Sequence, residues 1–288
     1  MSFFDIYLVE AMLNGVLLGG VLALLALGLN LIFGVVDVVW IAYAELVMAG
    51  MYVVYWLHAF GVPLVLAGVA AILVVAVMGL AVHQFIIAPI LNSAPVNQLL
   101  ATGGLLFFLQ NFATVLFSAE FRNIGVSLPS LRLGEISLSY ARIIAFAVAL
   151  LGVAGLYAFL KKTFVGAAIR AVAQDRPVMV LMGVDTRKIY LVTSAIGGGL
   201  AGLAALLLSL QIDVHPFVGL QYGPLTFMIC VMGGLGNLPG GFLASFLIGQ
   251  VISIVGYSFS QDFAYVVAFL LFILMMFWRP EGILRRRA

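Results

Sequence analysis

Long apolar segments follow one another along almost the whole of this chain, and they restrict its fold more than any other feature. A helix needs about 20 apolar residues to cross the hydrocarbon core of a bilayer, because it rises only about 1.5 Å per residue. The piece at 224–236 is too short for a full crossing, so we expect a tilted or half helix there. The apolar segments lie at roughly residues 9–33, 38–58, 62–88, 96–117, 140–160, 189–210, 224–236, 240–258 and 263–279.

Composition supports a membrane protein built as a single domain. Hydrophobic residues make up 65% of the chain and charged residues only 8%, and the mean hydropathy is +1.25. A soluble domain of 288 residues could not cover its surface with so few charges. We therefore expect residues 1–288 to form one all-α integral membrane domain, a polytopic helical bundle of about 8–10 transmembrane segments.

One charged interruption, at residues 161–188, sets the expected orientation in the membrane. Lys and Arg collect on the cytoplasmic side of membrane proteins, so this segment is predicted to be cytoplasmic. Counting apolar segments from this anchor places the N-terminus outside and the arginine-rich C-terminus in the cytoplasm. The loop at 118–139 fits less well, because it then lies outside although it carries Arg122 and Arg132. The interruption contains six of the thirteen basic residues: Lys161, Lys162, Arg170, Arg176, Arg187 and Lys188.

The same interruption has the pattern of a folded unit. The residues indicate a short helix, a turn at Asp175–Arg176, a second short helix opened by Pro177 and a stop at Gly183. A structured cytoplasmic unit between two membrane segments suggests a surface made for a partner protein.

Missing motifs argue against several other functions. The chain has only three lysines, none of them in a G-x-x-x-x-G-K-[ST] phosphate loop, so it is not expected to hydrolyse a nucleotide. Its three histidines are far apart and form no metal-ligand pattern. There is no G-x-S-x-G motif and no basic face for nucleic acid. We therefore expect no enzyme activity, no metal or other cofactor and no nucleic-acid partner.

Four polar residues within apolar segments are candidates for a solute path, because a polar side chain in a membrane is costly unless it faces protein or water. Glu45 either points into this path, or orients a neighbouring broken helix, or is an interfacial carboxylate near a helix end. Gln110 belongs to a polar group in its segment for which hydrogen bonding between helices is the alternative. The four candidates are Asn30, Glu45, Gln110 and Asn237.

Glycine spacing suggests close helix packing. Gly15 and Gly19 are one helical turn apart, as are Gly198 and Gly202. Small residues at this spacing let helix backbones approach closely, in a packed core or at a subunit interface, although glycine is also common in membrane helices generally.

The run GGLGNLPGG at 233–241 is either a tight turn or an unwound break whose backbone groups line a solute path.

Several motifs together resemble one family of transporters. GAAIRAVAQDR at 166–176 and LMGVD at 181–185 resemble the cytoplasmic coupling loop, the EAA loop, of the permease subunits of branched-chain amino acid ABC importers. Further matches run in the family's order over essentially the whole chain: GLNLIFGV at 28–35, LLFFLQ at 105–110, GGLGNLPG at 233–240 and RPEG at 279–282.

The resemblance implies a multi-pass permease subunit in the inner membrane of a bacterial or archaeal cell. Its partners would be ABC ATPase subunits, which hydrolyse the ATP, a second permease subunit and an extracytoplasmic solute-binding protein. The solute would be leucine, isoleucine or valine, or a related small solute such as another amino acid, urea or an amide. The residues expected to couple the loop at 161–188 to the ATPase are Gly166, Arg170, Gln174, Asp175, Met182, Gly183 and Asp185.

Two departures from the family pattern leave the solute open. The residues before Glu45 are usually Asn-Phe-Ala-His-Gly, whereas this chain has WIAYA at 40–44. An Arg-rich turn of the family is replaced by APIL at 88–91. The sequence also does not decide between a paired identical permease and a mixed pair. An ion-coupled secondary transporter that uses Glu45 is the alternative function, and a channel or a purely structural membrane partner is a weaker one.

Overall fold

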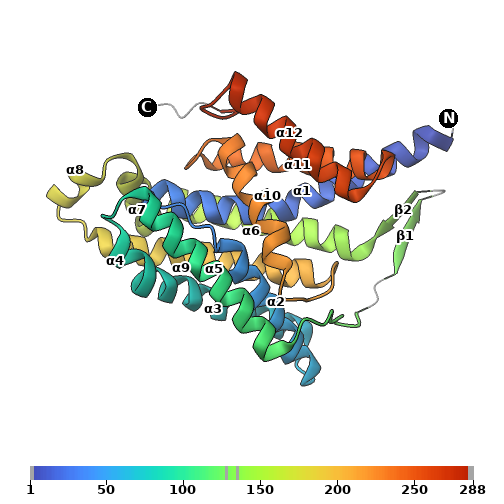
Figure 1. Cartoon of the computed structure of the whole chain (residues 1–288), viewed down its shortest axis with the longest axis horizontal. Coiled ribbons are helices and arrows are strands. Elements are labelled where there is room, and N and C mark those ends of the chain that lie inside the picture. Colours follow the sequence, from blue (N-terminus) through green and yellow to red (C-terminus); the bar gives the residue numbers. More distant parts are fainter. Residues whose placement is uncertain (1–2, 127–128, 134–135, 285–288) are drawn as a thin grey trace.

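The protein is a bundle of helices with one small β-hairpin (Figure 1). A computed structural model describes residues 3–126, 129–133 and 136–284. The helices and strands are α1 (Phe3–Val36), α2 (Tyr43–Ala59), α3 (Leu64–Val82), the π-helix η1 (His83–Ile87), α4 (Ala88–Ile90), α5 (Pro95–Phe117), β1 (Ser130–Leu133), β2 (Ile136–Ser139), α6 (Tyr140–Lys162), α7 (Phe164–Gln174), α8 (Arg176–Leu181), α9 (Thr186–Ser209), α10 (Val218–Gly233), α11 (Leu238–Ser258) and α12 (Gln261–Trp278).

Each of the nine predicted apolar segments is a helix, so the predicted polytopic helical fold is confirmed. Within the described residues, seven helical stretches are long and apolar enough to cross a bilayer. They are α1, the continuous stretch from α3 through η1 to α4, α5, α6, α9, α11 and α12. Helices α2 and α10 have only 17 and 16 residues, and the shortness of α2 was not predicted.

Glycines bring the central helices into close contact. Helix α1 packs along α11, and α9 packs along α3. A Cβ placed on Gly249 of α11 would lie 2.7 Å from the carbonyl oxygen of Gly15 and 2.9 Å from Cα of Gly19. A Cβ on Gly202 of α9 would lie 2.7 Å from Cα of Ile72 in α3. The predicted close packing of both glycine pairs is therefore confirmed, and it is made within this chain.

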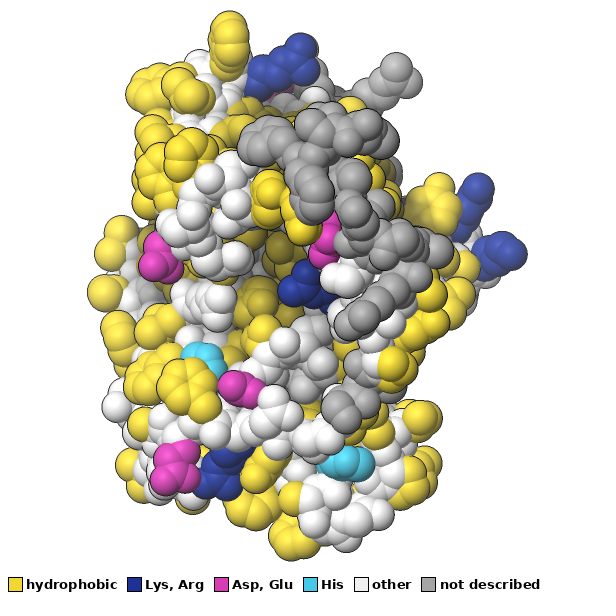
Figure 2. All heavy atoms as spheres, turned by 90° about the vertical axis from the view of Figure 1, so that its right-hand side faces the viewer, with side chains coloured by type: hydrophobic (Ala, Val, Ile, Leu, Met, Phe, Trp, Pro, Cys, Tyr) yellow, Lys and Arg dark blue, Asp and Glu magenta, His cyan; other side chains and the backbone are white. Residues whose placement is uncertain are grey.

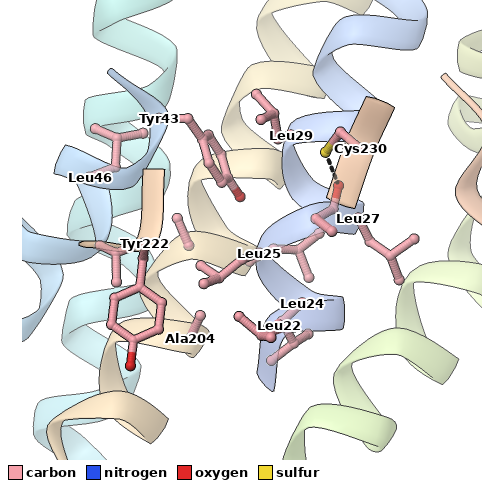
Figure 3. Close-up of a cluster of buried hydrophobic side chains, with 14 of the residues drawn as sticks. Leu22, Leu24, Leu25, Leu27, Leu29, Tyr43, Leu46, Ala204, Tyr222 and Cys230 are labelled. Carbon is pink, nitrogen blue, oxygen red and sulfur yellow. Dashed lines mark hydrogen bonds between the residues drawn. The ribbon is translucent and has the colours of Figure 1, made fainter. Parts of the chain in front are cut away.

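The core lies where α1 meets α2, α9 and α10. Figure 3 shows the leucines of α1 in this core, with Tyr43 and Tyr222 to one side of the helix and Cys230 joined by a dashed line to the α1 backbone. The Tyr43 hydroxyl donates to the carbonyl oxygen of Gly197 at 2.9 Å, and the Cys230 thiol donates to the carbonyl of Ala26 at 3.2 Å. These bonds satisfy polar atoms that the apolar core would otherwise leave unpaired.

The two ends of the bundle differ. The start of α1 and the β1–β2 hairpin lie at one end, and α7, α8 and the end of α12 lie at the other (Figure 1). This arrangement is the relative topology that was expected, while the choice of which end faces the cytoplasm stays a prediction. The arginines at 285–287 lie outside the described residues.

Candidate functional site

Residues 161–188 fold into a compact helical unit, here called the coupling segment. Helix α7 ends at Gln174, and Asp175 caps α8 by accepting a hydrogen bond from the Val178 amide at 3.1 Å. Gly183 has a φ of +80° just after α8, a conformation that favours glycine. The predicted order of helix, turn at Asp175, helix and stop at Gly183 is thus confirmed.

The segment is also fixed where it enters and leaves the bundle. Thr163 caps α7 by accepting a hydrogen bond from the Gly166 amide at 2.9 Å. Asp185 caps α9 by accepting one from the Lys188 amide at 3.3 Å. This backbone bond, followed by the bond from the Lys188 side chain, lowers the pKa of the Asp185 carboxyl.

Most of the predicted coupling residues are exposed, but Gly166 is buried. Arg170, Gln174, Asp175, Met182, Gly183 and Asp185 all lie on the surface of the segment. A Cβ on Gly166 would overlap the backbone of Phe159 and Leu160 at the end of α6. Gly166 therefore lets α7 fold back onto α6, and it presents no surface to a partner.

Large apolar side chains are also exposed on this segment. Phe164 is 89% exposed, Leu181 86% and Met182 75%. Such side chains beside charged ones at an end of a membrane bundle are typical of a docking surface. We call Leu181, Met182, Val178 and Val180 the apolar tip of the segment.

Arg176 joins the coupling segment to the end of α1. One guanidinium nitrogen, Nη2, donates to the carbonyl oxygens of Val35 at 3.1 Å and Val36 at 3.0 Å. The guanidinium also lies 5.0 Å from the ring centroid of Tyr190 in α9. The final carbonyls of a helix lack partners within the helix, so a cation there is well placed. The sequence analysis placed Arg176 among the basic residues and in the predicted turn, but it missed the contact with α1.

His83 continues this contact into the bundle. Its ring lies 6.0 Å from that of Tyr190, and its Nδ1 is 3.0 Å from the Ser194 hydroxyl. His83 opens the π-helix η1, a local irregularity that is often found at functional positions. The sequence does carry a signal for this position, because His83 is a polar residue inside the apolar segment predicted at 62–88. The sequence analysis considered His83 only as a metal ligand.

A cavity of about 690 Å³ brings together four of the predicted site residues. We call it the α1–α7 cavity, because α1, α6, α7 and the turn before α11 surround it. Asn30 and Asn237 come from the predicted solute path, and Arg170 and Gln174 from the predicted coupling set. Residues of the predicted solute path and of the predicted coupling set, which were expected to act separately, therefore line the same cavity.

Asn30 holds the turn between α10 and α11. Its Oδ1 accepts from the Gly236 amide at 2.9 Å, and its Nδ2 donates to the Asn237 carbonyl at 3.3 Å. Asn237 in turn caps α11 by accepting from the Gly240 amide at 3.1 Å. The GGLGNLPGG run is therefore a tight turn, which was one of the two interpretations. The side chains of Asn30 and Asn237 form hydrogen bonds with backbone groups of this turn.

Glu45 and Gln110 are both buried, in different places. Glu45 lies in the first turn of α2, near a helix end, and its side chain is 0% exposed. Within the described part of the chain, neither carboxylate oxygen has a hydrogen-bond partner. Gln110 is 6% exposed in α5 and lines none of the cavities described here.

A polar cavity of about 370 Å³ lies between α1, α6 and the last three helices. Arg142 lines it and donates from Nη1 to Asn14 Oδ1 at 2.8 Å. Figure 2 shows the end of the bundle that carries the start of α1, hollowed near its middle with a basic side chain in view. This cavity was not predicted.

Among the described residues, no group of three or more His, Cys, Asp or Glu is placed to hold a metal ion.

Comparison with known proteins agrees with this architecture. Residues 11–276 match the family described as branched-chain amino acid transport system / permease component. BraD of Pseudomonas aeruginosa, a high-affinity branched-chain amino acid transport system permease protein, is 31% identical over 96% of this chain and 95% of its own. LivH of Escherichia coli, a permease protein with the same description, is 29% identical over 98% of this chain and 96% of its own.

A solved structure supports the fold. PsaBC of Streptococcus pneumoniae, in complex with Fab, aligns with a TM-score of 0.51 and 14% identity over 93% of this chain and 91% of that one. The similarity is too distant to transfer more than the arrangement of helices. The match over residues 11–276 decides the assignment: the chain belongs to the family of branched-chain amino acid transport system permease components.

Proposed function

We propose that this permease of an ABC importer conducts leucine, isoleucine, valine or a related small solute inward across the inner membrane of a bacterial or archaeal cell. It would pair with a second permease and receive the solute from an extracytoplasmic binding protein. Separate ABC ATPase subunits would hydrolyse ATP. The relatives named as branched-chain amino acid permeases at about 30% identity support the solute class.

The observation that carries the proposal is the coupling segment. It places an exposed apolar tip at one end of the bundle, and Arg176 ties the segment to α1. Helix α1 packs along α6, α9 and α11. A displacement of the coupling segment would therefore be transmitted through α1 to the central helices. A movement of the ATPase could then change which end of the solute path is open.

The ion-coupled alternative keeps one supporting feature, the buried carboxylate of Glu45. The coupling segment has no use in a transporter that is driven by an ion gradient. ABC import therefore accounts for more of the molecule.

A charge placed on the apolar tip tests the docking role. We expect Leu181→Glu to release the ATPase subunits during purification of the co-expressed complex and to abolish ATP-driven uptake of leucine in proteoliposomes. Phe259→Glu is the matched control, because Phe259 is 75% exposed where α11 ends, far from the segment (Figure 1). Normal retention of the ATPase by Leu181→Glu, or equal loss in both variants, would contradict the proposal.

A further inference from the structure

The α1–α7 cavity carries positive charge that no acidic side chain offsets. Lys161, in the last turn of α6, and Arg170 of α7 both line it, and both side chains are exposed. No Asp or Glu among the described residues lines this cavity, and neither cation forms a salt bridge within the described part of the chain. A hollow lined by charge of one sign raises the local concentration of the opposite ion. We therefore expect this cavity to attract an anion.

Gln174 adds a neutral donor to these two cations. Its side chain is exposed and lines the same cavity. The amides of Asn30 and Asn237, which also line it, already hold the turn between α10 and α11. An ammonium, a guanidinium and an amide are together suited to the oxygens of a phosphate group.

The remaining wall is mainly apolar, and this decides what kind of phosphate fits. The cavity, at about 690 Å³, falls within the range of about 300–1,000 Å³ for small-molecule sites. A free phosphate ion would fill little of this space and would leave the apolar wall in water. A lipid carries the same phosphate in its headgroup and brings acyl chains that cover such a wall. The apolar wall includes Leu31, Val35, Leu160, Ile169, Ala173 and Leu238.

The end of α6 places the cavity at the depth of lipid headgroups. Helix α6 is long and apolar enough to cross a bilayer, and Lys161 lies in its last turn. The Lys161 ammonium lies 6.0 Å from the ring centroid of Tyr157, which also lines the cavity and is 61% exposed. Tyr and Lys side chains near the end of a membrane helix are typical of the boundary between hydrocarbon and water. We therefore expect the cavity to lie at that boundary, within reach of a lipid.

We propose that the α1–α7 cavity binds an anionic phospholipid. Lys161 and Arg170 receive the phosphate, Gln174 donates to one of its oxygens, and the acyl chains start along the apolar wall. Basic pockets between membrane helices on the cytoplasmic side bind anionic headgroups in this way. The lipid would contact α7 together with α1 and α6 and so join the coupling segment to the bundle. This site does not depend on which solute the permease carries.

Removal of both cations is the first test. The complete complex carrying Lys161→Gln and Arg170→Gln is purified in detergent and titrated with phosphatidylglycerol, and native mass spectrometry measures the bound fraction. A basic residue near a lipid surface contributes about fivefold to binding, so we expect the apparent Kd to rise about 30-fold for the pair. The matched control is Lys162→Gln with Arg187→Gln, which removes the same charge from exposed positions of the coupling segment that do not line the cavity. We expect the Kd of this control to stay within about twofold of the wild type.

A second variant fills the cavity without changing its charge. Ala173 lines the cavity, so Ala173→Phe should place a ring where the lipid would lie and weaken phosphatidylglycerol binding about tenfold or more. Ala167→Phe is the matched control, because Ala167 is exposed on the same helix and does not line the cavity. Equal binding of phosphatidylglycerol by these two variants would overturn the site.

The outcomes separate an anionic lipid from other occupants. We expect the wild-type complex to bind phosphatidylglycerol more tightly than phosphatidylcholine, and equal binding of the two would overturn the proposal. Equal weakening by the two pairs of charge substitutions would assign binding to general surface charge and overturn it as well. Displacement of the lipid by an equal concentration of inorganic phosphate would identify a soluble anion as the ligand instead. Failure of the wild-type complex to retain any phosphatidylglycerol would show that a partner subunit covers the cavity, and the proposal would be wrong.

Discussion

Replacing Arg176 should separate ATP hydrolysis from transport while leaving the ATPase bound. In Arg176→Ala the coupling segment loses both hydrogen bonds to the end of α1, at Val35 and Val36, and the contact with the Tyr190 ring. The apolar tip that is proposed to meet the ATPase is unchanged. We therefore expect a complex that assembles and hydrolyses ATP but transmits little of the movement to the bundle.

The size of the effect follows from the contacts. Hydrogen bonds from a charged donor contribute about 1.5–3 kcal/mol each when buried, and a cation over a ring adds about 0.5–1 kcal/mol. Arg176 is half-buried, so water replaces part of what is lost, and we expect a total of about 2–3 kcal/mol. This free energy lowers the ratio of attached to detached segment by roughly 30- to 150-fold.

The assay is the number of leucine molecules imported per ATP hydrolysed in proteoliposomes. We expect this ratio to fall about tenfold in Arg176→Ala and by less in Arg176→Lys, which keeps the charge but loses the planar fork and its stacking. Arg187→Ala is the control, because it removes the same charge from an exposed position of the same segment. A ratio for Arg176→Ala that equals the ratio for Arg187→Ala would refute the mechanical role of the contact with α1.

Three further outcomes follow from the same structure. Gly166→Leu should place its side chain against the backbone at the end of α6, so uptake should be uncoupled from ATP hydrolysis while membrane insertion, followed by membrane fractionation, is retained. Asn30→Ala should free the Gly236 amide and lower stability by about 1–3 kcal/mol, seen as an earlier midpoint in thermal unfolding of the purified complex. The pKa of Asp185 is lowered in the folded protein, so its stabilisation of the start of α9 is present above the ordinary Asp pKa and is lost as pH falls through the folded value. Hydrogen exchange at the Lys188 amide, corrected for intrinsic rates, should accelerate over that acidic range in the wild type and already be fast at neutral pH in Asp185→Ala.

The helices could be predicted because hydrophobic length is a local property. The same holds for the coupling segment, where Pro177 and Gly183 mark its second helix in the sequence itself. The hairpin of β1 and β2 was expected only as a loop, because two strands of four residues each have too little pattern to stand out.

The site was harder to predict because its parts are far apart in the sequence. Arg176 meets Val35 across 141 positions, and Asn30 meets Gly236 across 206. Nothing in the apolar run around either residue indicates its partner. The lack of a partner for the Glu45 carboxylate among the described residues is a property of packing, so only the folded chain reveals it. The polar character of Glu45 alone made it a candidate.

Helix α1 has 34 residues and is therefore about 51 Å long, whereas the hydrocarbon core of a bilayer is only about 30 Å thick. Its companions α11 and α9, with 21 and 24 residues, fit that layer much better. We therefore expect the first turns of α1 to extend beyond the hydrocarbon layer, beside the hairpin, whose Ser137 hydroxyl donates to Glu10 at 3.3 Å. A protein that approaches this end of the bundle would then contact the start of α1 and the hairpin before it contacts the membrane surface.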